Sequence, residues 1–220
     1  MAEKESIFAS VEPTDKGVRS LDRIKERFGI SELPKALHSI VGSESGANDI
    51  YMNLNRQLAD GKMTEKTKLI VAVAVASAVG SQRGVEFFGE IAIAKGRTRN
   101  EVLDAVSAAT VCSIFNGYYR FRDHVPHEEK ATFEAFRAPF NANVFMKSAL
   151  DSFEVEAICV AVSSLNGCHI CVSGHLNKAR SLGMTNEQVD ELIRASAAAF
   201  AVANALSALP EAPVVHSAGA

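Results

Sequence analysis

LIVAVAVASAVG at residues 69–80 and EAICVAVSSLNG at residues 156–167 are two copies of one sequence pattern, offset by 87 residues without a gap. Apolar residues follow one another too continuously at residues 69–79, and again at residues 192–209, for half-buried strands, and a glycine ends each of the two copies. The alignment continues downstream, where Gly96 matches Gly183. Each copy therefore predicts the same unit of a helix, a glycine turn, a second helix, a glycine stop and a third helix.

The third helix of each copy begins with a recognisable cap. Thr98 is followed three residues later by Glu101, and Thr185 is followed by Gln188 at the same spacing. In such a capping box the hydroxyl and the later side chain satisfy free backbone N–H groups at the start of a helix. We therefore predict an all-α fold, a helical bundle made from a duplicated unit, with almost no sheet.

The chain divides into three regions. Residues 1–20 are polar and contain Pro13 and Gly17, which predicts a loose N-terminal arm, with packing expected to begin near Leu21. Residues 21–150 form a helical half that carries the first, degenerate copy. Residues 151–220 form a second helical half that carries the reactive residues.

Composition excludes several classes of protein. The chain of 220 residues is 47% hydrophobic and 22% charged with a net charge of −3, so it has no basic excess for binding nucleic acid. No uncharged run reaches the ~20 residues of a membrane span, and the N-terminus does not resemble a signal peptide. We expect a cytoplasmic protein, in which four cysteines indicate redox or metal chemistry rather than a disulfide scaffold.

Positions that differ between the copies are the candidates for function. Two cysteines, one histidine and one glutamate of the second copy have no chemical counterpart in the first. The pairs are Cys168 and Ser81, Cys171 and Gly84, His175 and Phe88, and Glu156 and Leu69. The chemistry is therefore expected in the second copy only.

A cysteine attacks as its thiolate, and the ordinary thiol pKa of about 8.5 leaves little thiolate at neutral pH. Asn166-Gly167 predicts a helix start at Cys168, where free N–H groups and the helix dipole favour a negative charge. His175 lies four residues after Cys171, on the same face of that helix, where an imidazole can accept a thiol proton. Both cysteines therefore have a means of activation.

Glu156 joins this group if two helices form an antiparallel hairpin around the glycine turn. Counting from the turn at 1.5 Å per residue places Glu156 at a depth of roughly 15 Å and His175 at roughly 12 Å. A carboxylate beside an imidazole raises its basicity and fixes its tautomer, so Glu156, His175 and Cys171 can form a proton relay. Cys168 and Cys171 are close enough in sequence to form a disulfide after one of them has been oxidised.

The motif E-x11-C-x2-C-x3-H, which runs from Glu156 to His175, resembles the active-site motif of the AhpD branch of the carboxymuconolactone decarboxylase superfamily. The stretch NGYYRFR at residues 116–122 is also similar to that branch, and the resemblance covers roughly residues 40–210. It implies an all-helical duplicated fold, usually a homotrimer or a multiple of one, that reduces alkyl hydroperoxides through a CxxC disulfide.

The resemblance also implies partners. The electrons of such proteins come from a dihydrolipoyl group on a 2-oxoacid dehydrogenase subunit, a peroxiredoxin is served in turn, and no bound cofactor or metal is expected. One position departs from the pattern, because the family histidine immediately before the second cysteine is Ile170 here. The histidine is shifted to His169, for which we expect at most a minor role, together with a lower peroxidase efficiency.

The order in which the two thiols react stays open on spacing alone. The electrostatics of a helix start favour Cys168 as the attacking thiol. The pairing with His175 and the resemblance favour Cys171, with Cys168 resolving, and we expect this second order.

Three other functions use some of the same residues. A general thiol–disulfide oxidoreductase would need the cysteine pair but would need Glu156 and His175 less. A non-redox decarboxylase would have no use for paired cysteines. A zinc-held structural protein could use Cys168, Cys171 and His175, with Glu156 or water as the fourth ligand. The remaining cysteines, at positions 112 and 159, lie in apolar runs and are expected in the core.

Overall fold

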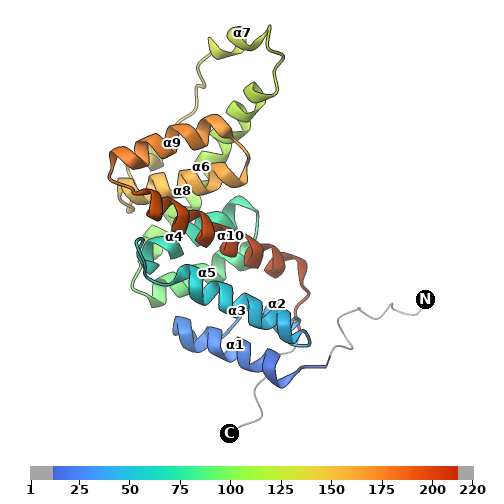
Figure 1. The fold of residues 1–220 in the computed structure, drawn as a ribbon. Helices are drawn as coiled ribbons and strands as arrows, with labels where there is room; N and C mark the ends of the chain where they lie inside the picture. Colours follow the sequence, from blue (N-terminus) through green and yellow to red (C-terminus); the bar gives the residue numbers. More distant parts are fainter. Residues whose placement is uncertain (1–11, 213–220) are drawn as a thin grey trace, which may run out of the picture.

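The computed structural model describes residues 12–212, which form an all-α bundle with no β-strand among them (Figure 1). The predicted fold class is therefore confirmed. The elements in chain order are α1 (Asp15–Phe28), α2 (Lys35–His38), α3 (Glu44–Leu58), α4 (Glu65–Ala78), α5 (Gln82–Ala94), α6 (Arg99–Asp123), α7 (Lys130–Glu134), the 3-10 helix η1 (Asn143–Phe145), α8 (Ser152–Leu165), α9 (His169–Ser181) and α10 (Asn186–Ala208).

The predicted repeat is confirmed helix by helix. α8 and α9 begin and end 87 residues after α4 and α5, and α10 begins 87 residues after α6. The turns match as well, because Gly80 and Gly167 have φ angles of 71° and 67° in the left-handed region that glycine adopts without strain. Both predicted capping boxes, at Thr98 and Thr185, are present. The two copies therefore share one architecture.

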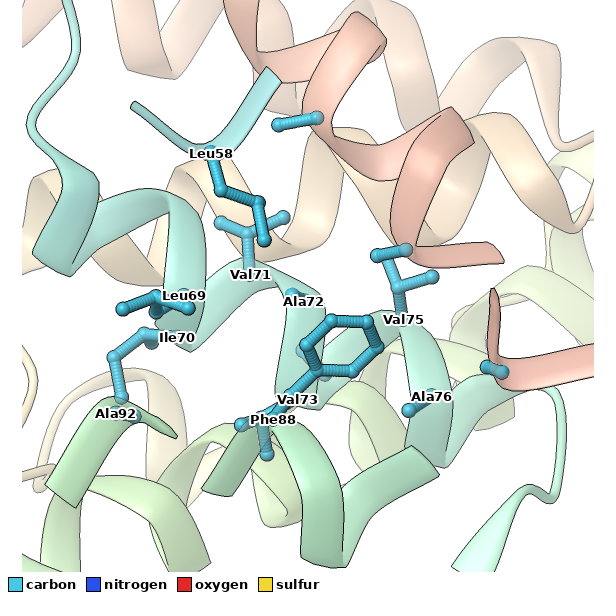
Figure 2. Close-up of a cluster of buried hydrophobic side chains, with 14 of the residues drawn as sticks. Leu58, Leu69, Ile70, Val71, Ala72, Val73, Val75, Ala76, Phe88 and Ala92 are labelled. Carbon is cyan, nitrogen blue, oxygen red and sulfur yellow. The ribbon is translucent and has the colours of Figure 1, made fainter. Parts of the chain in front are cut away.

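The core is centred on α4. Residues 67–76 of this helix are all buried, and the helix packs against α5, α6, α8 and α10. Figure 2 shows the apolar side chains of α4 beside Leu58 of α3 and Phe88 of α5. A helix surrounded on every side needs apolar residues on every side, which explains why this run lacks amphipathic spacing. α8 is buried in the same way from residue 157 to residue 163.

Part of the predicted N-terminal arm is helix. α1 begins at Asp15, and the side chain of Thr14 caps it by accepting a hydrogen bond from the backbone N–H of Gly17. Gly17 lies so close to the backbone of Val41 that a Cβ would clash with the Val41 carbonyl, and Val18 is buried. Residues 15–20 are therefore packed helix, because a cap and a close contact outweigh their polar composition. Residues 1–11 of the predicted arm lie outside the described residues, and the division of the chain at residue 150 stays a prediction.

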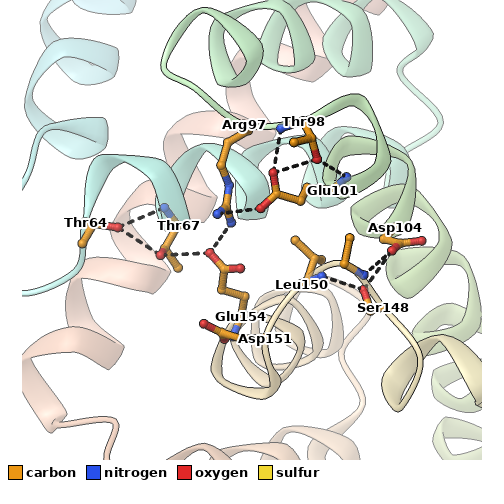
Figure 3. Close-up of polar contacts among 11 residues, drawn as sticks. Thr64, Thr67, Arg97, Thr98, Glu101, Asp104, Ser148, Leu150, Asp151 and Glu154 are labelled. Carbon is orange, nitrogen blue, oxygen red and sulfur yellow. Dashed lines mark hydrogen bonds and ion pairs between the residues drawn. The ribbon is translucent and has the colours of Figure 1, made fainter.

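A buried polar cluster fixes the start of α8 (Figure 3). Glu154, which is 6% exposed, accepts hydrogen bonds from Thr67 of α4 and Arg97 before α6. Arg97 also pairs with Glu101 at 3.0 Å. The cluster joins α4, α6 and α8 two residues before Glu156 and so orients the helix that carries it.

The segment between the two copies projects from the bundle, with α7 at its tip (Figure 1). None of the α7 residues is buried, whereas η1 returns to the body of the protein and packs on α6. In the described part of the chain, no helix combines the length and the apolar character that crossing a membrane requires.

Candidate active site

The cysteine pair lies at the start of α9, where the α8–α9 hairpin turns. Cys168 is the N-cap residue of α9 and Cys171 is in its first turn, as the Asn166-Gly167 turn predicts. The two cysteines are joined by a disulfide with their Cα atoms 5.3 Å apart. Cys168 is fully buried, whereas Cys171 keeps 8% of its surface exposed.

Glu156 and His175 face each other across the same hairpin. Glu156 Oε2 lies 2.8 Å from His175 Nδ1, and the two side chains are 16% and 23% exposed. Burial alone lowers the pKa of His175, but the hydrogen bond and the negative charge of Glu156 outweigh it and raise this pKa above its ordinary value. The bond leaves the second ring nitrogen, Nε2, without a role in the pair, so it can accept a proton.

A cavity of about 510 Å³ opens beside these residues. Cys171 and His175 both line it, and Cys168 does not, so an incoming molecule meets the sulfur of Cys171 first. The other residues that line it are Phe115, Tyr119, Ala142, Phe145, Ile170 and Gly174. The exposure of Cys171 and its neighbour His175 favours Cys171 as the attacking thiol, in line with our expectation.

Aromatic side chains form the walls of the cavity. Phe115 stacks on Tyr119 with their centroids 6.3 Å apart, and Phe145 meets the imidazole of His175 edge-on at 6.2 Å. Arg122 lies over the Tyr119 ring and helps to hold it. No sequence pattern predicted Phe115 or Phe145 at the site, because their approach depends on how α6 and η1 pack. The NGYYRFR stretch did point to Tyr119.

A chain of amides holds the turn before Cys168. Asn166 donates to Asn116 Oδ1 at 2.9 Å, and the buried Asn116 donates to Ser163 Oγ at 2.9 Å. Arg120 of α6 donates to the carbonyl of Asn166 at 3.2 Å. α6 therefore supports the turn that places both cysteines.

Cys112 of α6 and Cys159 of α8 are fully buried, as predicted for core residues. Their surroundings are unexpected, because their sulfur atoms and a ring nitrogen of His175 all lie within 4.8 Å of one another. A hydrogen bond from the Cys159 thiol, with smaller contributions from Ser163, His175 and Asn116, lowers the pKa of Cys112 to about 7. The same bond and burial raise the pKa of Cys159.

The position that departs from the family motif faces the cavity. Ile170 is 52% exposed and lines the cavity beside Cys171. His169 is exposed and is not among the residues that line the cavity. Ile170 therefore places an apolar side chain at the edge of the cavity.

Comparison with known proteins places this chain in a family. The model of the carboxymuconolactone decarboxylase family matches residues 131–212, which include the cysteine pair. A protein of Anaeromyxobacter dehalogenans named alkyl hydroperoxide reductase AhpD is 34% identical over 175 residues, which are 79% of this chain and 91% of the relative. Proteins of the same name from Mycobacteroides abscessus and Solibacter usitatus are 32% and 33% identical; each match covers 74% of this chain, and 91% and 88% of the respective relatives.

The matches extend well beyond the CxxC motif, because they cover about three quarters of the chain and nearly all of each relative. The helical duplication that the sequence predicts and the structure contains spans most of the same region. The chain therefore belongs to the AhpD group of the carboxymuconolactone decarboxylase family.

Proposed function

We propose that this protein is a thiol peroxidase that reduces alkyl hydroperoxides through Cys168 and Cys171, with Glu156 and His175 as a proton relay. One observation carries the proposal: Cys171 and His175 line the same apolar cavity, and Glu156 is bonded to Nδ1 of the imidazole. The name that the relatives carry, alkyl hydroperoxide reductase AhpD, supports the same activity.

The reaction begins with the reduced cysteine pair. His175 takes the proton of Cys171, and the thiolate attacks the terminal oxygen of the hydroperoxide. The O–O bond breaks, the alkoxide takes the proton back from His175 and leaves as an alcohol, and Cys171 becomes a sulfenic acid. Cys168 then attacks the Cys171 sulfur, its proton leaves with the hydroxyl as water, and the disulfide forms.

An external dithiol completes the cycle by thiol–disulfide exchange, in which the dithiol is oxidised and both cysteines are reduced. We propose a dihydrolipoyl group on a 2-oxoacid dehydrogenase subunit as this donor, a peroxiredoxin as a further partner, and a cytoplasmic location. These assignments rest on the family resemblance. The apolar walls of the cavity favour an organic peroxide over hydrogen peroxide, since aromatic side chains gain by covering an alkyl group.

A general thiol–disulfide oxidoreductase is the second candidate, because the Cys168–Cys171 disulfide alone serves that activity. That activity includes no reaction with peroxide, so it needs the Glu156–His175 pair less. Reaction with peroxide before any disulfide substrate is added therefore separates the two functions.

The test is to trap the first intermediate. In Cys168→Ser the resolving thiol is absent, so treatment with cumene hydroperoxide and a sulfenic-acid probe such as dimedone should label Cys171, as mapped by mass spectrometry. Cys171→Ser should give no label at Cys168. Cys168→Ser/Cys112→Ala serves as the matched control and should label at Cys171 as Cys168→Ser does. Labelling of Cys168 in Cys171→Ser, with none at Cys171 in Cys168→Ser, would reverse the two roles, and no label in either would remove the peroxidase assignment.

A further inference from the structure

Cys112 and Cys159 have no part in the proposed peroxidase cycle, yet they lie beside its proton acceptor. Cys112 comes from α6 and Cys159 from α8, and both sulfur atoms lie within 4.8 Å of a ring nitrogen of His175. Both side chains are fully buried, while His175 reaches the cavity. Of these three side chains, only the imidazole of His175 lines the cavity.

The internal repeat shows what these positions need for packing alone. Cys159 corresponds to Ala72 of the first copy, and Cys112 corresponds to Ala199 of α10. Both alanines are buried, at 1% and 0% exposure, in the equivalent contact between α4 and α10. Alanine methyl groups therefore fill these two positions in one half of the molecule. Packing alone does not require the sulfur atoms that occupy them in the other half.

The residues around the sulfur atoms differ between the halves in the same way. Cys112 Sγ lies 3.4 Å from Ser163 Oγ and 3.7 Å from Asn116 Oδ1. The counterparts of Ser163 and Asn116 are Ala76 and Ala203, so the equivalent place is apolar throughout. The half that carries the CxxC pair therefore also carries a polar, sulfur-rich pocket that the fold does not require.

Two thiolates and an imidazole are ligands for a thiophilic metal ion. Zinc binds sulfur at about 2.3 Å and imidazole nitrogen at about 2.0–2.1 Å in a tetrahedron, which separates the ligand atoms by about 3.5–3.8 Å. A group within 4.8 Å reaches that spacing by small side-chain movements. Glu156 bonds His175 Nδ1, so a metal ion that takes the imidazole as a ligand would compete with its acceptance of the Cys171 proton.

We propose that Cys112, Cys159 and His175 form a binding site for a thiophilic divalent ion of the zinc class, and that its occupation blocks peroxide reduction by engaging His175. The fourth ligand is water or a carboxylate oxygen of Glu156. The ion enters through the cavity, because His175 is the one member of the group that lines it. Cys168 and Cys171 are not ligands of this site. Binding of the ion therefore does not require that the CxxC pair be reduced or present.

Binding is tested where the CxxC pair cannot contribute. In reduced Cys168→Ser/Cys171→Ser protein without oxygen, titration with Co²⁺ should saturate at one ion per chain, with a thiolate-to-cobalt charge-transfer band and the intense visible bands of tetrahedral cobalt. Zn²⁺ should displace the cobalt. Adding Cys112→Ala or Cys159→Ala should remove the charge-transfer band, or halve it with a large loss of affinity for cobalt. Adding His175→Gln should weaken cobalt binding at least about tenfold. His169→Gln is the matched control and should change nothing.

The alanine variants are expected to fold, because Ala72 and Ala199 occupy the equivalent places, and circular dichroism checks this. Absence of stoichiometric binding in the parent, or binding that survives Cys112→Ala/Cys159→Ala, would overturn the site. The inhibitory part rests on the proposed function and has its own readout. One equivalent of Zn²⁺ should slow the reaction of the reduced full chain with cumene hydroperoxide at least tenfold, and should not slow that of Cys112→Ala/Cys159→Ala. Equal inhibition of both proteins would overturn that part and leave the cobalt result standing.

Discussion

At the scale of single residues, Glu156 and His175 set the charge at the site. Their 2.8 Å hydrogen bond joins α8 to α9 and places a negative charge beside the imidazole. The first copy has Leu69 and Phe88 at these positions, which bury apolar surface and offer no proton acceptor. The charge and the tautomer of one histidine therefore depend on one carboxylate.

The pKa of His175 should lie above the ordinary histidine value of about 6.5 and should fall in Glu156→Gln. The pH titration of the histidine ring protons by NMR measures it, with His175→Gln identifying the signal. A raised pKa in the folded state adds stability that is fully present below about pH 6.5 and is lost as the pH rises through the folded value. The stability difference between wild type and Glu156→Gln should therefore shrink with rising pH, and a difference that grows would contradict the pairing.

Removing either relay residue should slow the peroxide step without unfolding the protein. General acid–base catalysis is typically worth about 10²–10⁴-fold, so we expect Glu156→Gln and His175→Gln to lower the rate of Cys171 oxidation by at least about 10²-fold. Stopped-flow measurement with cumene hydroperoxide gives the rate, and circular dichroism reports the fold. The exposed His169 is the control, since His169→Gln should retain most of the rate. A Glu156→Gln protein as fast as wild type would exclude the relay.

At the scale of helices, the carboxylate of Glu191 links α10 to α4 through an ion pair. Glu191 Oε2 lies 2.8 Å from the buried ammonium of Lys68, and its two oxygens also accept the backbone N–H groups of Lys62 and Met63. Although burial opposes it, this set of donors lowers the pKa of Glu191 to about 2. The contact connects the third helix of the second copy to the first helix of the first copy.

Glu191→Gln should lower the free energy of unfolding by about 3 kcal/mol, because the buried Lys68 ammonium loses its carboxylate partner and keeps its hydrogen bond to the Ala59 carbonyl. Urea unfolding at neutral pH measures this loss. The adjacent Asp190 is 68% exposed, so Asp190→Asn is the control and should cost less than about 0.5 kcal/mol. A lowered folded pKa gives stability that is present above the ordinary value of about 4.3 and is lost as the pH falls through about 2. The difference in unfolding free energy between wild type and Glu191→Gln should therefore shrink in acid.

At the scale of the whole molecule, α6 leaves an apolar stripe uncovered. Leu103, Ile114 and Phe121 share one face of α6 and are 62%, 47% and 53% exposed, with the exposed Ser107 and Thr110 between the first two. Large exposed apolar side chains that share a face are typical of a surface between subunits. The stripe therefore supports an association of subunits, for which the family resemblance implies a homotrimer or a multiple of one.

Sedimentation equilibrium should show a trimer or a multiple of three for the full chain. Leu103→Lys/Phe121→Lys should shift the protein toward the monomer, because lysine charges cannot be buried in an apolar contact without a partner. Met52 of α3 is 40% exposed and away from the stripe, so Met52→Lys is the matched control. An association state unchanged by the double substitution would show that α6 does not form the interface.

The sequence alone predicts most of the fold because the duplication is strong and local signals agree with it. Glycine turns and capping boxes mark the helix ends in both copies, and residues 156–175 contain the four candidate site residues within one hairpin. The prediction that residues 15–20 belong to a loose arm was wrong, because composition hides the contact of Gly17 with Val41. The neighbours Cys112 and Phe145 could not be predicted, because they reach His175 only through the packing of α6 and η1.

The most direct test of the peroxidase assignment is a thiol count on the reduced full chain before and after one equivalent of an alkyl hydroperoxide, with mass-spectrometric mapping of the product. We predict the loss of two thiols per chain, a Cys168–Cys171 disulfide, one alcohol per peroxide, and a rate that falls in Glu156→Gln. Thiols that stay unchanged in the presence of peroxide would contradict the assignment and favour a protein that exchanges disulfides without reducing peroxides.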